Sequence, residues 1–94
     1  MSIFSGLTSY AGKWQVKSVA PMSAEDIASV ASAHVVNSQY GLSCCFMMKA
    51  GNMHFIPMDQ NCSTAPGEVL DLNKVKVVTL EKQGEADIQR IRPE

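Results

Sequence analysis

The chain has 94 residues, of which 46% are hydrophobic and 18% are charged, and its formal net charge is -1. A chain of this length has no room for a second independent core, so we expect residues 1–94 to form a single domain, in which 1–12 can be a loose N-terminal segment. The apolar content excludes intrinsic disorder, and the near-zero charge argues against a strongly basic nucleic-acid binder. No apolar run approaches the roughly 18–20 residues of a membrane span, so we expect no membrane association.

The cysteine content indicates the cellular compartment. The chain has three cysteines, Cys44, Cys45 and Cys62. An odd number cannot be fully paired within one chain, and a secreted disulfide scaffold would have a different pattern. The first residues have neither the basic region nor the long apolar stretch of a signal peptide. We therefore predict a reducing, cytoplasmic setting.

The first predicted strand covers Lys13–Val19. Its residues alternate, with Trp14 and Val16 on one face and polar side chains on the other, which is typical of a half-buried strand. Pro21 ends the strand because proline lacks the N–H group that a sheet needs.

A helix is predicted at about 23–31. Ser23 is a favourable N-cap, and Asp26 stands three residues later, near the positive end of the helix. The end of the helix is poorly marked, since the β-branched residues that follow suit a strand. We place a second strand at 33–38.

Leu42–Lys49 and Met53–Met58 predict a β-hairpin. A two-residue loop, Gly51-Asn52, would suit a type II′ turn. In that register one face is wholly apolar, and we assign it to the core: Phe46, Met48, Met53 and Phe55. The other face is mixed and is either partly covered or free to meet a partner.

The second half of the chain predicts a loop and two further strands. The polar residues, prolines and glycines of 59–68 indicate a loop. Val69–Leu80 is the strongest β segment, and its apolar phase slips at Val77-Val78, which indicates a bulge or a strand buried on both faces. Ala86–Ile91 is the last strand, with a short helix as the alternative.

This element order predicts a β-rich α+β fold. Strands joined by short turns pair in antiparallel fashion. Five or six short, curved strands with one helix fit a small, partly open barrel that is similar to the oligonucleotide/oligosaccharide-binding (OB) fold. A flat sheet with the helix on one face is the alternative.

The residues with reactive side chains do not form a recognisable catalytic or metal-binding motif. In the predicted register Cys45 and His54 share a face but stand more than about 10 Å apart along the strand. No spacing matches a structural zinc site, no glycine-rich phosphate loop is present, and no carboxylate pair is spaced for acid–base chemistry. We expect a protein that is not an enzyme and that has no metal site and no cofactor.

Basic and aromatic residues provide the remaining functional signal. Cations alternate on three predicted strands, with aromatic rings nearby, and single-stranded nucleic acid is bound by such a combination of cations and stacking platforms. Equally, lysines alternate on any strand with one wet face. The candidate nucleic-acid-binding residues are Lys13, Trp14, Lys17, Tyr40, Lys74, Lys76, Arg90 and Arg92. The alternative partner is a protein, through self-association to a homo-oligomer or inhibition of a host factor, since a methionine-rich hairpin face can adapt to a protein surface.

Several turn and strand motifs carry a resemblance to known proteins. They are Ser38-Gln39-Tyr40-Gly41, Phe55-Ile56-Pro57, Leu70-Asp71-Leu72, Leu80, Gly84-Glu85 and Asp87-Ile88-Gln89-Arg90-Ile91. Over roughly residues 13–92 the chain resembles small uncharacterised proteins of phages and mobile elements of gut bacteria. The resemblance implies no activity, but it favours accessory roles in replication or in interaction with a host.

Overall fold

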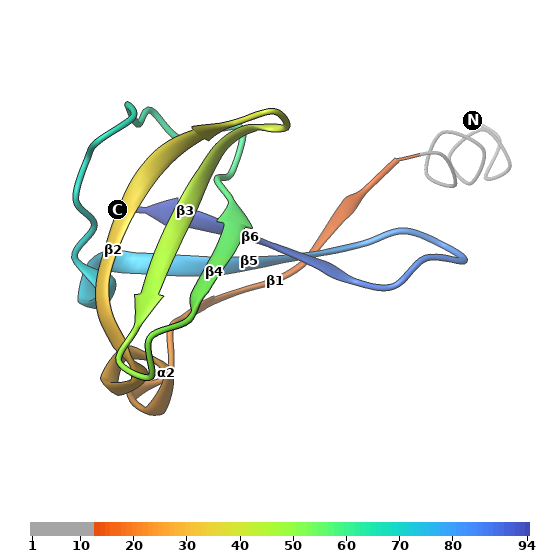
Figure 1. Cartoon of the computed structure of the whole chain (residues 1–94). Helices are drawn as coiled ribbons and strands as arrows, with labels where there is room; N and C mark the ends of the chain where they lie inside the picture. The colour runs from red at the N-terminus through yellow and green to blue at the C-terminus, as the bar shows by residue number, and fades with distance from the viewer. Residues whose placement is uncertain (1–12) are drawn as a thin grey trace, which may run out of the picture.

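The computed structural model describes residues 13–94 and shows six strands, one short α-helix and one 3-10 helix. The predicted loose segment 1–12 lies outside the described residues. Figure 1 shows the elements in two layers, with one sheet in front of the other. In chain order they are β1 (Gln15–Pro21), α2 (Ala24–Ser29), β2 (Val30–Ser38), β3 (Gly41–Met48), β4 (Met53–Pro57), η1 (Leu72–Lys74), β5 (Val75–Glu81) and β6 (Ile88–Pro93).

The helix α2 is shorter than the predicted span 23–31. Ser23 caps it as expected, because its hydroxyl accepts a hydrogen bond of 3.1 Å from the backbone N–H of Asp26. The helix ends at Ser29, and Val30 already has extended dihedral angles. The β-branched Val30 therefore begins β2, and the strand that we placed at 33–38 is longer than predicted at its start.

The first sheet has the order β2-β3-β4, and all of its pairs are antiparallel. The hairpin between β3 and β4 differs from the prediction by three residues in register, since Cys45 pairs with Phe55 and not with Met58. Gly51 donates its N–H to the carbonyl of Met48 at 2.9 Å, and Met48 donates to the carbonyl of Asn52 at the same distance. Gly51 has a φ of 100°, so the loop is a turn followed by a left-handed glycine rather than the two-residue loop that we predicted.

This register corrects the predicted faces of the hairpin. Cys45 pairs with Phe55, and Phe46 pairs with His54. Because side chains alternate along a strand, a shift by an odd number of residues moves every β4 side chain to the other face. Phe46 is 3% exposed and lies in the core as predicted, but Phe55 is 57% exposed and lies outside it.

The second sheet has the order β1-β5-β6, again antiparallel. The strand predicted at Val69–Leu80 begins only at Val75, because a 3-10 turn capped by Asp71 precedes it. Val77 and Val78 pair regularly with Ala20 and Val19 of β1, and the register shift lies further along, between Val16 and Ser18 of β1. The other predicted explanation, a strand buried on both faces, is correct: Val75 and Val78 point to opposite faces of β5, and both are buried.

The two sheets join at one corner. After β4, Met58 forms a parallel bridge with Ile91 of β6, and Asp59 donates its N–H to the carbonyl of Ile91 at 2.8 Å. The core lies between the sheets and includes Val35 and Phe46. The β-rich, antiparallel prediction is confirmed. The sheets do not form a closed barrel, and an OB-like fold is not confirmed.

Segment 59–68 contains no helix or strand. It leads the chain back to the free edge of β2, where Val35 donates to the carbonyl of Glu68 at 2.8 Å and Gly67 donates to the carbonyl of Val35 at 2.7 Å. Within residues 13–94, no helix has the length and apolar character needed to cross a membrane.

Replacing each of the two hairpin phenylalanines by alanine tests the register. Phe46→Ala should lower the free energy of unfolding by about 3–5 kcal/mol, because it empties a buried site. Phe55→Ala should cost less than about 1 kcal/mol, because most of that ring is already in water. Urea unfolding of both variants measures the difference, and equal losses would contradict the register described above.

Candidate nucleic-acid interface

Cations from β6 gather on the face of the β1-β5-β6 sheet that is turned away from the core. The cross-strand pairs Lys76–Arg92 and Val78–Arg90 place these side chains on one face. The opposite face of the same sheet carries Ile91, which belongs to the core. Alternation along β5 and β6 therefore places Lys76, Arg90 and Arg92 on this outer face, together with the buried Val78.

Two adjoining hollows lie on this outer face. The first, of about 380 Å³, is lined by side chains of β1, β5 and β6 and by the turn 59–61, and these include Lys13, Trp14, Arg90 and Arg92. The second, of about 290 Å³, lies beside the β2–β3 turn and includes Tyr40 and Arg90. Both contain Asp59 and Gln60. We call the two hollows together the outer furrow.

The structure brings five of the eight candidate residues to the outer furrow. These five are Lys13, Trp14, Tyr40, Arg90 and Arg92. Asp59 and Gln60, which also line the outer furrow, were not among the predicted residues. The signal that could have indicated them is the polar turn directly after β4, which the structure places against β6.

The other three candidate residues do not line the outer furrow, although Lys76 shares the outer face with its cross-strand partner Arg92. Lys17 forms an exposed ion pair with Asp87 at 2.8 Å, and this hydrogen bond raises the pKa of Lys17. Lys76 stands 3.8 Å from Glu94, and Lys74 is an exposed residue of η1. We therefore do not include them in the interface.

Asp59 anchors the furrow. One of its carboxylate oxygens accepts a hydrogen bond of 2.7 Å from Arg92, and the other accepts one of 3.4 Å from the N–H of Asn61. Burial by itself would raise the pKa of Asp59, but the bonds from Arg92 and Asn61 and the charges of Arg92 and Arg90 together lower it. The carboxylate thus stays ionised and orients Arg92.

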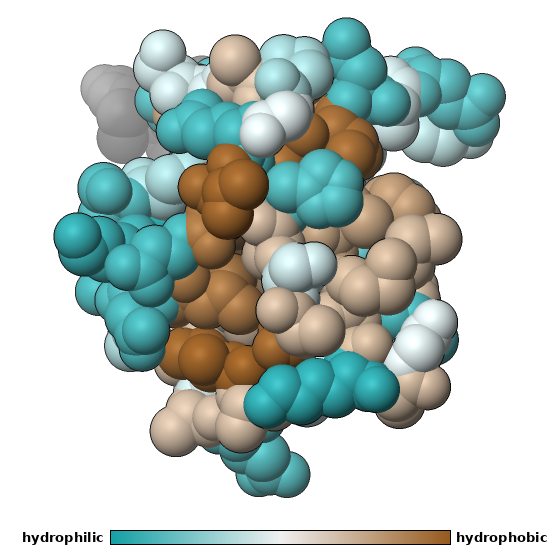
Figure 2. Space-filling view, turned by 60° about the vertical axis from the view of Figure 1, so that its left-hand side comes forward, coloured by the Kyte–Doolittle hydropathy of each residue, from teal (hydrophilic) through white to brown (hydrophobic). Residues whose placement is uncertain are grey.

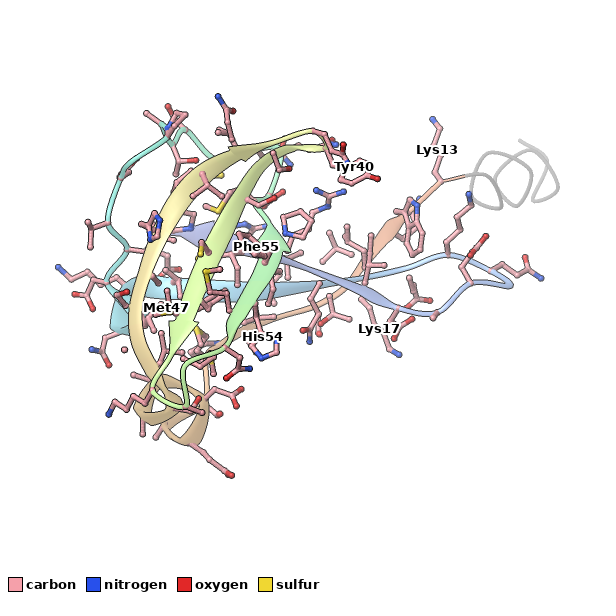
Figure 3. All side chains as sticks on the ribbon, viewed as in Figure 1. Lys13, Lys17, Tyr40, Met47, His54 and Phe55 are labelled. Carbon is pink, nitrogen blue, oxygen red and sulfur yellow. The ribbon has the colours of Figure 1, made fainter. Side chains whose placement is uncertain are left out.

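The aromatic rings differ in their surroundings. Tyr40 is 85% exposed and lies at the tip of the β2–β3 turn, on the side of the molecule where Lys13 begins (Figure 3). Ser38 holds this turn, since its hydroxyl accepts from the N–H of Tyr40 at 3.1 Å and donates to the carbonyl of Gly41 at 2.7 Å. The ammonium group of Lys82 stands 5.8 Å from the centre of the Trp14 ring, within the range of a cation–π contact.

Arg90 has a free hydrogen-bonding capacity in the furrow. One guanidinium nitrogen donates to the carbonyl of Met58 at 3.3 Å. A guanidinium has five N–H donors, so most of them remain available to a ligand. Lys13, Arg90 and Arg92 together outweigh the single negative charge of Asp59.

Cys45 and His54, the pair considered in the sequence, do not come together as a Cys–His pair. Cys45 and His54 lie on opposite faces of the first sheet, since each pairs with the neighbour of the other. Burial, and to a lesser extent the charge of Cys45, raises the pKa of the Cys44 thiol to about 12, so Cys44 remains protonated. Across residues 13–94, no cluster of three or more His, Cys, Asp or Glu side chains is arranged to hold a metal ion.

Comparisons with known proteins add no assignment. No protein-family model, curated protein or solved structure matches this chain. The candidate interface therefore rests on the geometry of the furrow.

The Asp59–Arg92 pair should make stability depend on acid pH. A carboxyl whose folded pKa is lowered stabilises the fold fully above its unfolded pKa of about 3.9, and this contribution is lost as pH falls through the lower folded pKa. Asp59→Asn should remove about 1 kcal/mol at pH 7 and flatten the loss of stability below about pH 4. Urea unfolding across this pH range, with the exposed Asp87→Asn as control, measures the effect. An equal pH profile for Asp59→Asn and the unmodified protein would rule out this role.

Proposed function

We propose that this protein is a small, non-enzymatic module that binds single-stranded nucleic acid in the outer furrow. One observation carries the proposal: Trp14 lines one hollow, Tyr40 lines the next, and Arg90 lines both. A strand lying along the furrow would meet aromatic faces for its bases and cations for its phosphates. Duplex DNA is a poorer fit, because its bases are not free to stack on these rings.

The charge of the protein limits the affinity that we expect. The net charge is -1, so no long-range field draws nucleic acid to the whole surface. Binding must come from the few cations of the furrow, and each phosphate contact adds a salt-dependent contribution. We therefore expect weak, salt-sensitive binding of a short stretch of nucleotides.

The proposal includes a reducing, cytoplasmic setting and an accessory role in replication. Three free thiols, Cys44, Cys45 and Cys62, support the first part. The resemblance to small proteins of phages and mobile elements supports the second.

Fluorescence anisotropy with a labelled single-stranded oligonucleotide at low salt tests the proposal. Arg90→Gln should weaken binding several-fold and reduce the dependence of log K on log salt by about one. Tyr40→Ala should weaken binding by about 1–3 kcal/mol if one base stacks on the ring. Lys74→Gln removes an exposed cation outside the furrow and serves as the control.

The control makes the outcomes distinct. Lys74→Gln should bind like the unmodified protein. The proposal fails if the unmodified chain does not bind at low salt, if binding ignores salt, or if Lys74→Gln loses as much affinity as Arg90→Gln.

A second candidate function is self-association through the outer face of the β2-β3-β4 sheet. Phe55 and Met53 are both more than half exposed there, and Met47 shares their face. Figure 2, which brings the β2 side forward, shows brown and tan side chains across the middle of the view and teal ones at its margins. The register places no Lys, Arg, Asp or Glu of β2, β3 or β4 on this face, so a second copy could meet it without like-charge repulsion.

Light scattering coupled to size-exclusion chromatography tests this second function. The unmodified protein should elute as a dimer whose mass falls on dilution, and Phe55→Ser should shift it to a monomer, because a polar side chain would be buried at the contact. Tyr40→Ser, which removes an exposed ring on another surface, should leave the mass unchanged. A strict monomer at all concentrations would exclude self-association.

A further inference from the structure

Soft sulfur and nitrogen donors gather on the outer face of the β2-β3-β4 sheet. Cross-strand pairing places Cys45 between His34 on β2 and Phe55 on β4, and it places Met47 opposite Met53. The thiol sulfur of Cys45 lies 3.9 Å from the thioether sulfur of Met53. Figure 3 shows Met47 and Phe55 on the front of this sheet. One small area of β2, β3 and β4 thus combines a thiol, two thioethers and an imidazole.

We propose that Cys45 and Met53, with Met47 or His34 as the third ligand, bind a Cu(I) ion. Thiolate and thioether sulfur are soft ligands that select Cu(I), and imidazole also suits copper. Zinc sites use thiolates, imidazoles and carboxylates, and methionine sulfur is not among their usual ligands. A donor set that contains methionine sulfur therefore favours Cu(I) over Zn²⁺.

The distance between the two sulfur atoms fits an ion bound to both. With metal–sulfur bonds of about 2.3 Å, a separation of 3.9 Å corresponds to a sulfur–metal–sulfur angle of about 115°. This angle is close to that of a trigonal site, which needs one more ligand. Side chains directly opposite on neighbouring strands have Cβ atoms about 4.5–5.5 Å apart, so Met47 and His34 are both near enough to supply it.

The two sulfur ligands differ in their exposure to solvent. Cys45 is only 3% exposed, whereas Met53 is 52% exposed. The flexible Met53 side chain can move aside to admit the ion and then close over it. Phe55, the cross-strand partner of Cys45 on β4, adds an apolar neighbour to the site.

Binding involves no change in oxidation state. As the bond between Cu(I) and the Cys45 sulfur forms, the S–H bond breaks and its proton passes to solvent. The thioethers bind through a lone pair and lose nothing. Cys44 points to the opposite face of β3 and lies in the core, so it does not compete for the ion.

Anaerobic titration of the full chain with Cu(I), in competition with the colorimetric chelator bathocuproine disulfonate, tests the site. The unmodified protein should retain one equivalent of copper. Met53→Leu keeps the size of an exposed side chain but removes its sulfur, so it should lower the affinity by about tenfold or more. Cys45→Ala should retain no copper.

Matched variants control for the other sulfur atoms. Met48→Leu changes the next methionine along β3, on the opposite face, and Cys62→Ser removes a thiol in the loop. Both should bind like the unmodified protein, and far-UV circular dichroism checks that each variant is folded. The site is refuted if the unmodified chain yields all its copper to the chelator, if Met53→Leu binds as tightly as the unmodified chain, or if Cys62→Ser abolishes retention. Met53→Leu alone decides the matter if Cys45→Ala does not fold.

Discussion

The contact between β6 and the residues directly after β4, where the two sheets cross, is the constraint on which the rest of this structure depends. Each sheet has one face of apolar side chains that is removed from water when the two sheets pack together. The bridge from Met58 to Ile91 brings the two faces together, and the ion pair of Asp59 with Arg92 fastens the chain just after it. Figure 1 shows the result, with β6 passing behind β4 and the β5–β6 hairpin extending beyond the other sheet.

The same crossing produces two outer surfaces of opposite chemistry. On the β1-β5-β6 sheet, the turn that follows Met58 folds against β6 and completes a furrow with cations and exposed aromatic rings. On the β2-β3-β4 sheet, the outer face carries sulfur and apolar side chains such as Met53 and Phe55. A polyanion suits the first surface, whereas a second protein copy or a soft metal ion suits the other. The two surfaces can therefore be tested by independent substitutions.

Several features were predictable because their causes are local. Alternation identified β1, the Ser23 hydroxyl marked the start of α2, and Pro21 marked the end of the first strand. The position of β5 was less accurate, because Asp71 caps a 3-10 turn inside what reads as one continuous apolar run. The hairpin faces were wrong, since the loop around Gly51 is one residue longer than the shortest loop that the sequence allows. For the same reason the proximity of Cys45 and Met53 was not foreseen.

The sequence by itself determined the order and the approximate positions of the strands, the residue at which the helix begins, and which residues carry positive charge or aromatic rings. These properties follow from period-two alternation, capping and turn chemistry, which act between residues close in the chain. Only the tertiary structure decided the pairing of Met58 with Ile91, the choice of five basic and aromatic residues for the furrow, and the face on which Phe55 lies. These depend on strand register and on contacts between residues distant in sequence, and a change of one residue in a loop reverses them.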